Sequence, residues 1–245
     1  MSARNHGLIF NWEFFTCRGG QLNLDRRVRM FSQDLAEVGY QLAHIGKWHI
    51  GDVNRPADYG YDGVYHPGYG FPDTHAHYQN YLSQLGLDGF VTTRPTQGPR
   101  GRVYAALQEG PTEASVPAYL ANQTIDTLEH YATVDKPFFV SCNFWGPHAP
   151  FRITNPHYDM YDPADCDVWP NFQAPLDDKP RIVPRQGQTF DTGWMREDDL
   201  RGLIARHYGY VTLIDDQIGR ILKKLEELGK LDETLIIYAA DHGSA

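Results

Sequence analysis

The sequence predicts an α/β protein with a central, predominantly parallel sheet flanked by helices. Two observations lead to this fold class. Three short apolar runs each have the character of a buried strand, and each ends in charged or imidazole residues followed by glycine or proline. Stretches with helical periodicity lie between these runs, so strands and helices alternate as they do around parallel sheets. The three expected strands are residues 41–45, 137–145 and 234–240.

The composition is that of a globular protein with an acidic surface. The chain has 245 residues, enough for one large or two small domains, and 41% of its residues are apolar. A formal net charge of −9 and the lack of a Lys/Arg run argue against a nucleic-acid-binding surface. No stretch approaches the roughly 18 apolar residues of a transmembrane helix. No signal-peptide pattern is visible, which leaves periplasmic, secreted and cytoplasmic locations open.

The three cysteines do not indicate a disulfide framework or a zinc site. They are too few and too scattered for either role, and no pair has zinc-site spacing. Cys142 lies inside an expected strand and should behave as a small buried hydrophobe. The other two are Cys17 and Cys166.

The stretch around the first strand carries the strongest functional signal. Apolar residues spaced three and four apart predict a helix over residues 28–38, and Gly39 follows as its C-terminal cap. The strand 41–45 comes next, and Lys47 and His49 would project together from its C-terminal edge. Ligands of open α/β sheets bind at that edge. An ammonium beside an imidazole there suits an anionic substrate or a developing negative charge.

Two long segments lack lasting periodicity. Residues 52–114 are rich in Gly, Pro, Tyr and His, and residues 152–196 contain six dispersed prolines that exclude a regular helix or central strand. Both are expected to be long loops on the substrate side. Three histidines of the first segment are expected to lie on the surface rather than to bind a metal. They are His66, His75 and His77.

Two further helices are expected, one over residues 115–133 and one over residues 198–228. The second has the clearest helical period in the chain, and Gly209 is expected to bend or split it. Three of its side chains could suggest catalysis but are expected to be structural, the histidine as a packed residue and the aspartates on a solvated face or against a neighbouring loop. They are His207, Asp215 and Asp216.

Three motifs together resemble one known family. They are Gly-Tyr-x-x-x-x-Ile-Gly-Lys-Trp-His at 39–49, Pro-His-x-Pro-Phe at 147–151 and Asp-His-Gly at 241–243. In this order, and each after a strand-like run, they resemble the sulfatase family of the alkaline-phosphatase superfamily. The resemblance implies an alkaline-phosphatase-like sulfatase core and the hydrolysis of sulfate monoesters of small molecules or carbohydrates.

The resemblance also implies a role for each matching residue. Lys47 would hold the sulfuryl oxygens, and His148 would donate a hydrogen bond to a sulfate or leaving-group oxygen. His49 would pair with the nucleophile and act as a base. Asp241 and His242 would supply part of a divalent-metal site. Calcium is the first expectation there, with Mg²⁺ and Mn²⁺ also open and the imidazole favouring Mn²⁺ or Zn²⁺ somewhat.

The nucleophile of the family is a formylglycine, made from the Cys or Ser of Cys/Ser-x-Pro-x-Arg, and this motif is absent from the sequence. Cys17 lacks that context and is not expected to be catalytic. Residues 4–8 resemble a segment that follows the nucleophile in sulfatases. The chain is therefore expected to be an incomplete sulfatase catalytic domain over residues 1–245, truncated at both ends. It would lack the nucleophile and the C-terminal domain, and by itself would be close to inactive.

Two alternatives stay open from the sequence. One is a phosphomonoester or phosphonate monoester hydrolase on the same scaffold, since such enzymes share the layout of metal and cation. The other is a non-catalytic remnant that keeps a binding cleft. The identity of the nucleophile, and the relative turnover of aryl sulfate and aryl phosphate, would separate these readings. A formylglycine-generating enzyme is expected as a partner of the full-length protein.

Overall fold

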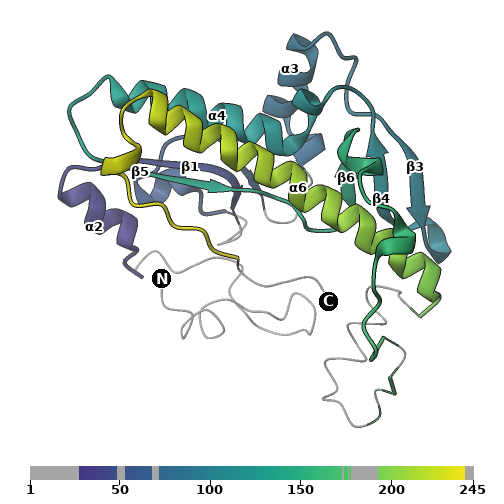
Figure 1. The fold of residues 1–245 in the computed structure, drawn as a ribbon. Helices are drawn as coiled ribbons and strands as arrows, with labels where there is room; N and C mark the ends of the chain where they lie inside the picture. Colours follow the sequence, from purple (N-terminus) through teal and green to yellow (C-terminus); the bar gives the residue numbers. More distant parts are fainter. Residues whose placement is uncertain are drawn as a thin grey trace. The chain divides into compact units, whose positions relative to one another are not determined.

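The computed structural model describes residues 28–48, 53–67, 72–172, 174–175, 177 and 193–240. The described residues fall into two compact units, and each unit is described by itself. Figure 1 shows their helices and strands along the chain. Unit 1 takes its described residues from 1–81, 116–145 and 217–239, and unit 2 takes them from 82–115, 146–216 and 240.

Unit 1 is built on a parallel sheet of three strands in the order β2-β1-β5. These strands are β1 (Gln41–Trp48), β2 (Tyr65–Pro67) and β5 (Phe138–Asn143), and β1 pairs with both of its neighbours in parallel. Most of β1 is buried along its length, which is typical of a strand covered on both faces. The parallel sheet predicted from the sequence is thereby confirmed.

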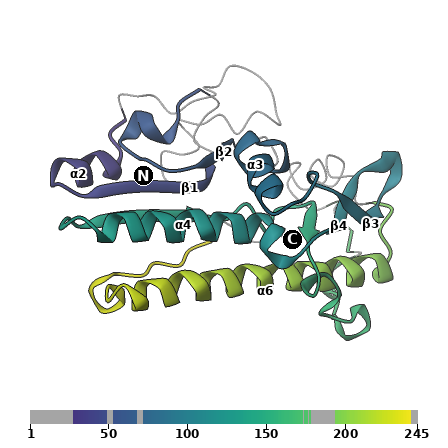
Figure 2. The ribbon, with the colours of Figure 1, turned by 90° about the horizontal axis from the view of Figure 1, so that it is seen from above.

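Helices cover the sheet of unit 1. Helix α4 (Val116–Ala132) packs against β1 and β5, and the short helix α2 (Phe31–Glu37) packs against β1. Figure 2 shows α4 running along β1. The C-terminal part of α6 (Glu197–Glu227) joins α4 through polar contacts. Lys224 Nζ lies 2.8 Å from Glu129 Oε1, and Arg220 Nη2 donates to Asn122 Oδ1 at 2.6 Å.

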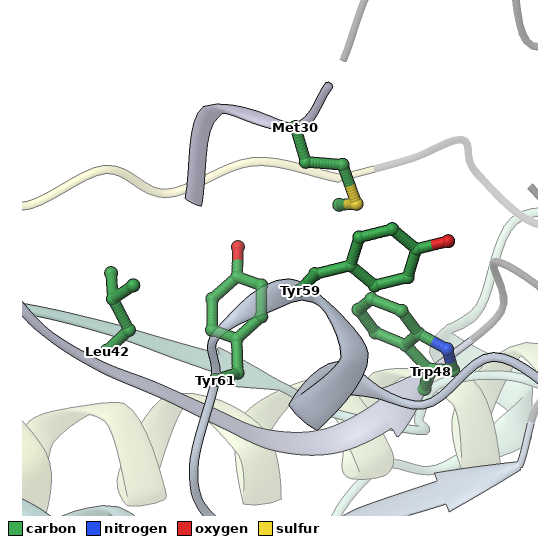
Figure 3. Close-up of a cluster of buried hydrophobic side chains, with 5 residues drawn as sticks. All are labelled: Met30, Leu42, Trp48, Tyr59 and Tyr61. Carbon is green, nitrogen blue, oxygen red and sulfur yellow. The ribbon is translucent and has the colours of Figure 1, made fainter. Parts of the chain in front are cut away.

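An aromatic cluster fixes the C-terminal end of β1 (Figure 3). Trp48, the last residue of β1, donates from its indole N–H to the carbonyl oxygen of Asn54 at 2.7 Å. The Asn54 amide donates to the hydroxyl of Tyr59 at 3.0 Å, so this buried polar group has a partner. The end of β1 is therefore held by both packing and hydrogen bonds. The buried members of the cluster are Met30, Leu42, Trp48, Tyr59 and Tyr61.

Unit 2 contains a second sheet of three strands, in the order β3-β4-β6. Strand β3 (Thr92–Gln97) is antiparallel to β4 (Val103–Gln108), and β4 is parallel to β6 (Phe151–Ile153). Its remaining helical segments are short, apart from the N-terminal part of α6. Helix α3 (Ala76–Gln84) lies across the boundary in sequence between the two units.

Short 3₁₀ helices occur throughout the described chain. They are η2 (Pro56–Tyr59), η3 (Pro72–Thr74), η4 (Pro99–Gly101), η5 (Thr112–Ala114), η6 (His157–Asp159), η7 (Pro163–Asp165) and η8 (Leu231–Glu233). None of the helices in the described residues is both long and apolar enough to span a membrane.

The predicted helices 115–133 and 198–228 are confirmed as α4 and α6, and the helix predicted over 28–38 is the shorter α2. Gly209 was predicted to bend its helix or to split it in two. The helix is not split, because α6 is one continuous helix. Gly209 instead permits a close approach of two backbones. A Cβ atom at this position would lie 2.1 Å from the carbonyl oxygen of His157.

The predicted strand over residues 234–240 is wrong. The chain leaves η8 and continues without regular structure, and the side chains of Leu235, Ile237 and Tyr238 are exposed. An apolar run becomes a strand only when a neighbour takes up its backbone hydrogen bonds. No strand of the described chain pairs with this segment.

The expectation of irregular chain over residues 52–114 is also wrong. This segment contains β2, α3 and the β3–β4 hairpin. These elements carry many polar side chains, and β3 is largely exposed and contains Pro95, so their hydrophobic periodicity is weak. The described part of residues 152–196 is irregular apart from the end of β6 and the short helices η6 and η7, as expected. A substrate-side role for both segments stays a prediction.

Candidate functional site

The last residue of β5, Asn143, lies opposite Gly46 near the C-terminal end of β1 in the parallel register. Gly46 has a φ of +97°, a left-handed conformation that side chains rarely adopt. A Cβ atom at this position would lie 2.1 Å from the carbonyl oxygen of Asn143. Glycine is therefore required here for two reasons, and it directly precedes Lys47.

Lys47 lies in β1, one residue before the strand ends, and its side chain is partly buried. Its ammonium nitrogen is 5.0 Å from the centroid of the Trp145 ring. Trp145 is itself buried and follows the end of β5. This cation–π contact places a positive charge at the C-terminal edge of the parallel sheet, next to an aromatic surface.

His44 links Lys47 to the neighbouring strand. Its Nε2 is 3.0 Å from the carbonyl oxygen of Lys47, and the amide nitrogen of Asn143 is 3.2 Å from its Nδ1. The ring also makes edge contacts with Trp48 and Tyr61, at centroid distances of 4.9 and 5.8 Å. Burial lowers the pKa of His44 to about 4, although its hydrogen bond to the Lys47 carbonyl acts in the opposite direction. The imidazole is therefore neutral near pH 7.

His148 lies in unit 2, on an exposed segment between β5 and β6. Its Nδ1 is 2.6 Å from the carbonyl oxygen of Ala149. A carbonyl oxygen can only accept a hydrogen bond, so Nδ1 carries the hydrogen in this arrangement. In this tautomer Nε2 of the neutral ring is a hydrogen-bond acceptor.

The structure places two of the five predicted site residues, Lys47 and His148. The other three lie outside the described residues, and they are His49, Asp241 and His242. Within the described ranges, no three Asp, Glu, His or Cys side chains gather in a way that could hold a metal ion. The described part of the chain therefore does not provide the implied metal site.

Sequence reasoning missed three residues at this strand edge. Trp145 and Asn143 were treated only as part of an apolar strand, and His44 was treated as an ordinary strand residue. A signal for His44 was available, since a histidine inside a strand buried on both faces needs a hydrogen-bond partner. Its position alone could not identify that partner.

The other polar residues considered from the sequence make packing or polar contacts within the fold. His75 and His77 stack at the start of α3 with ring centroids 5.3 Å apart, and burial together with the neighbouring imidazole lowers the pKa of His75. His207 packs edge-on against a phenylalanine ring of β6, which confirms its packing role. Asp216 lies 2.8 Å from Nε2 of His157, which confirms the expected contact with a neighbouring segment. The side chain of His66 lies outside the described part.

The fold and this strand edge define a class of protein, an α/β protein with a positive charge held at the C-terminal end of a parallel sheet. Comparison with known proteins makes the class specific. The Sulfatase family model matches residues 20–245, and the chain belongs to this family, as the three motifs predicted.

Individual relatives agree with the family assignment. An arylsulfatase of Clostridium perfringens is 33% identical over 132 residues, covering 51% of this chain and 26% of the relative. Human iduronate 2-sulfatase is 26% identical over 232 residues, covering 87% of this chain and 40% of the relative. The chain thus spans between about a quarter and two fifths of the length of these relatives.

A solved structure shows the same fold. The phosphonate monoester hydrolase of Silicibacter pomeroyi matches with a TM-score of 0.57 at 19% identity, over 86% of this chain and 46% of that one. At this identity the likeness concerns the fold alone. It confirms the alkaline-phosphatase-like α/β core predicted from the sequence.

Proposed function

We propose that the protein hydrolyses sulfate monoesters and that Lys47 binds the sulfuryl oxygens. The observation that carries this proposal is the Lys47 ammonium, held over Trp145 at the C-terminal edge of the parallel sheet. Membership of the sulfatase family supports it, because the family match includes this strand and both segments that follow β1 and β5. Sulfate carries negative charge throughout the reaction, so a fixed cation suits it at every stage.

Lys47 would act as a charge that is already in place. Its backbone belongs to a central strand, and its side chain rests against a buried indole ring. A charge fixed in this way needs little reorganisation when negative charge shifts onto the leaving oxygen. The lysine therefore stabilises the transition state without taking or giving a proton.

His148 and His49 would handle protons. Because Nδ1 of His148 donates to the Ala149 carbonyl, its Nε2 can donate to a sulfate or leaving-group oxygen only when the ring is protonated. We therefore propose that His148 binds the anion as an imidazolium. His49 would act as the base that helps to release sulfate from the nucleophile.

Two further components complete the proposal, and both lie outside the described residues. Asp241 and His242 would supply part of a divalent-cation site, for Ca²⁺ first and Mg²⁺ or Mn²⁺ next. Such a cation, when bound, neutralises negative charge on the ester. The nucleophile would be a formylglycine outside this chain, installed by a formylglycine-generating enzyme.

The substrate would be a small-molecule or carbohydrate sulfate. The carbohydrate class is supported by the match to iduronate 2-sulfatase, which extends over 87% of this chain. We propose that residues 52–114 and 152–196 shape the pocket for the alcohol part of the ester. Long segments that contain many loops commonly carry binding residues.

The test uses the full-length gene product, produced together with a formylglycine-generating enzyme. Turnover of an aryl sulfate is compared with that of the matching aryl phosphate and aryl phosphonate monoester. Lys47→Ala is expected to lower sulfate turnover by at least about a hundredfold, the usual scale for one charge-stabilising contact. Lys136→Ala, which removes an exposed lysine of unit 1, is the matched control.

Three outcomes would contradict the proposal. An unchanged rate for Lys47→Ala would remove this lysine from the site. Faster turnover of phosphate or phosphonate than of sulfate would favour the alternative hydrolases. Binding of inorganic sulfate without any hydrolysis would indicate the non-catalytic remnant.

A further inference from the structure

We propose that His44 is a positioning residue for Lys47. Its imidazole joins the Lys47 carbonyl on β1 to the Asn143 amide on β5, and thereby fixes the direction in which the lysine leaves the strand. This inference rests on the proposed function and deepens it, since the direction matters only if Lys47 binds the anion.

The hydrogen bonds around His44 are satisfied by a single tautomer. The Lys47 carbonyl oxygen can only accept, so Nε2 must carry the hydrogen across the 3.0 Å contact. Nδ1 is then an acceptor, and it faces the Asn143 amide nitrogen at 3.2 Å. The same nitrogen is 3.4 Å from Nε2, but that atom has its hydrogen directed at Lys47 and cannot accept.

Asn143 is oriented from its other side. An amide nitrogen has two hydrogens, and the second can be donated to the hydroxyl oxygen of Ser141, at 2.7 Å. Ser141, Asn143, His44 and the Lys47 carbonyl therefore form one chain of hydrogen bonds across two neighbouring strands. Such a chain determines where its last member lies more firmly than one contact alone.

The backbone conformation of β1 changes just before Lys47. Gly46 has a φ of +97°, so the backbone leaves the extended conformation immediately before the lysine. From Gly46 onward β1 pairs with β2, and Lys47 lies opposite His66 in that register. The contact from His44 to the Lys47 carbonyl restrains the chain just after this point.

Packing alone does not explain a histidine at position 44. The side chain is only 7% exposed and lies among the rings of Trp48 and Tyr61. An apolar residue would fill this space without the free-energy cost of burying an imidazole. Burial also keeps the ring neutral, with a pKa of about 4, so a proton-transfer role near pH 7 is excluded. The remaining role is to donate one hydrogen bond and accept another.

The test compares His44→Leu with His44→Gln in the full-length gene product. The Gln amide can reach the Nε2 position and donate to the Lys47 carbonyl, whereas Leu fills the space without a donor. We expect His44→Leu to lower kcat/KM for an aryl sulfate and the affinity for inorganic sulfate by about tenfold to a hundredfold. His44→Gln should recover most of that loss. Leu42→Val is the control, since it places a smaller side chain at a buried position of the same strand. It should lower stability and leave kcat/KM unchanged.

A double-mutant cycle separates positioning from general loss of structure. If His44 acts through Lys47, adding His44→Leu to Lys47→Ala should cause no further loss of kcat/KM. Equal losses in both backgrounds would overturn the inference. So would a His44→Gln variant as impaired as His44→Leu, or an imidazole NMR spectrum showing the Nδ1–H tautomer.

Two further comparisons keep the test decisive. Should His44→Leu fold poorly, His44→Asn replaces it, because the shorter amide cannot reach the Lys47 carbonyl while Gln can. Activity of His44→Asn equal to that of His44→Gln would then overturn the inference. Failure of the proposed function looks different, since Lys47→Ala would keep the full rate. A low rate for Lys47→Ala with a normal rate for His44→Leu refutes only the positioning role.

Discussion

Replacing Gly46 by alanine tests the geometry on which the site depends. Two separate costs are expected from the structure. A non-glycine residue in a left-handed conformation costs about 1–2 kcal/mol, and Gly46 has a φ of +97°. The new methyl group would also lie 2.1 Å from the Asn143 carbonyl oxygen, and forcing such an overlap apart costs about 1–3 kcal/mol.

Gly39→Ala is the matched control, because it isolates the first of these costs. Gly39 has a similar φ of +90°, but a Cβ atom there would meet nothing within 4 Å. Alanine also restricts the unfolded chain, which offsets up to about 1 kcal/mol in both variants. We therefore expect a loss of about 1 kcal/mol for Gly39→Ala and of about 3 kcal/mol for Gly46→Ala.

The assay is urea denaturation of the 245-residue chain, followed by far-UV circular dichroism at pH 7.5. The difference between the two variants, about 2 kcal/mol, measures the close approach of β1 and β5. A loss for Gly46→Ala no greater than that for Gly39→Ala would refute the reasoning. It would mean that the two strands can separate here at little cost, and the placement of Lys47 would then lose its support.

Two further predictions concern stability. Gly209→Ala should destabilise the chain, because its methyl group would lie 2.1 Å from the His157 carbonyl oxygen. Gly202→Ala in the same helix meets nothing within 4 Å and should stabilise the chain by up to about 1 kcal/mol. Thermal unfolding measures both variants, and a shift of the melting temperature in the same direction for both would contradict this prediction. Burial lowers the pKa of His44 from 6.5 to about 4. Between these two pH values the unfolded chain therefore binds more protons than the folded chain. About 3 kcal/mol of stability should therefore be present above pH 6.5 and lost as the pH falls to 4. Urea unfolding across this pH range measures it. An equal dependence of the free energy of unfolding on pH in His44→Leu would contradict the assignment.

The sequence predicted best those elements whose signal is contained within one stretch. The helical period of α4 and α6 repeats over several turns, so each could be recognised without its neighbours. Strand β1 was recognised because a strand buried on both faces is apolar throughout, and β5 was recognised from its apolar run although its residues are only partly buried. Lys47 was predicted to lie at the strand edge because the apolar run of β1 ends just before it.

The remaining features depend on partners that are distant in the sequence. An apolar run at 234–240 has the composition of a strand, but pairing is a property of two segments and is not encoded in one. His44 and Asn143 are 99 residues apart, and nothing local to either predicts their contact. The hairpin β3–β4 was missed because its exposed strand lacks the apolar alternation on which prediction relies.

The separation between β1 and β5 also has a kinetic consequence. The chain that joins them includes residues 82–115, which belong to unit 2, so the two strands can pair only after a long loop has closed. Loop-closure entropy opposes such non-local contacts until other structure has brought the ends together, and proteins rich in them fold slowly. The contact between His44 and Asn143 should therefore form late in folding, after α4 has formed locally. The strand edge that carries Lys47 would be among the last parts of unit 1 to assemble.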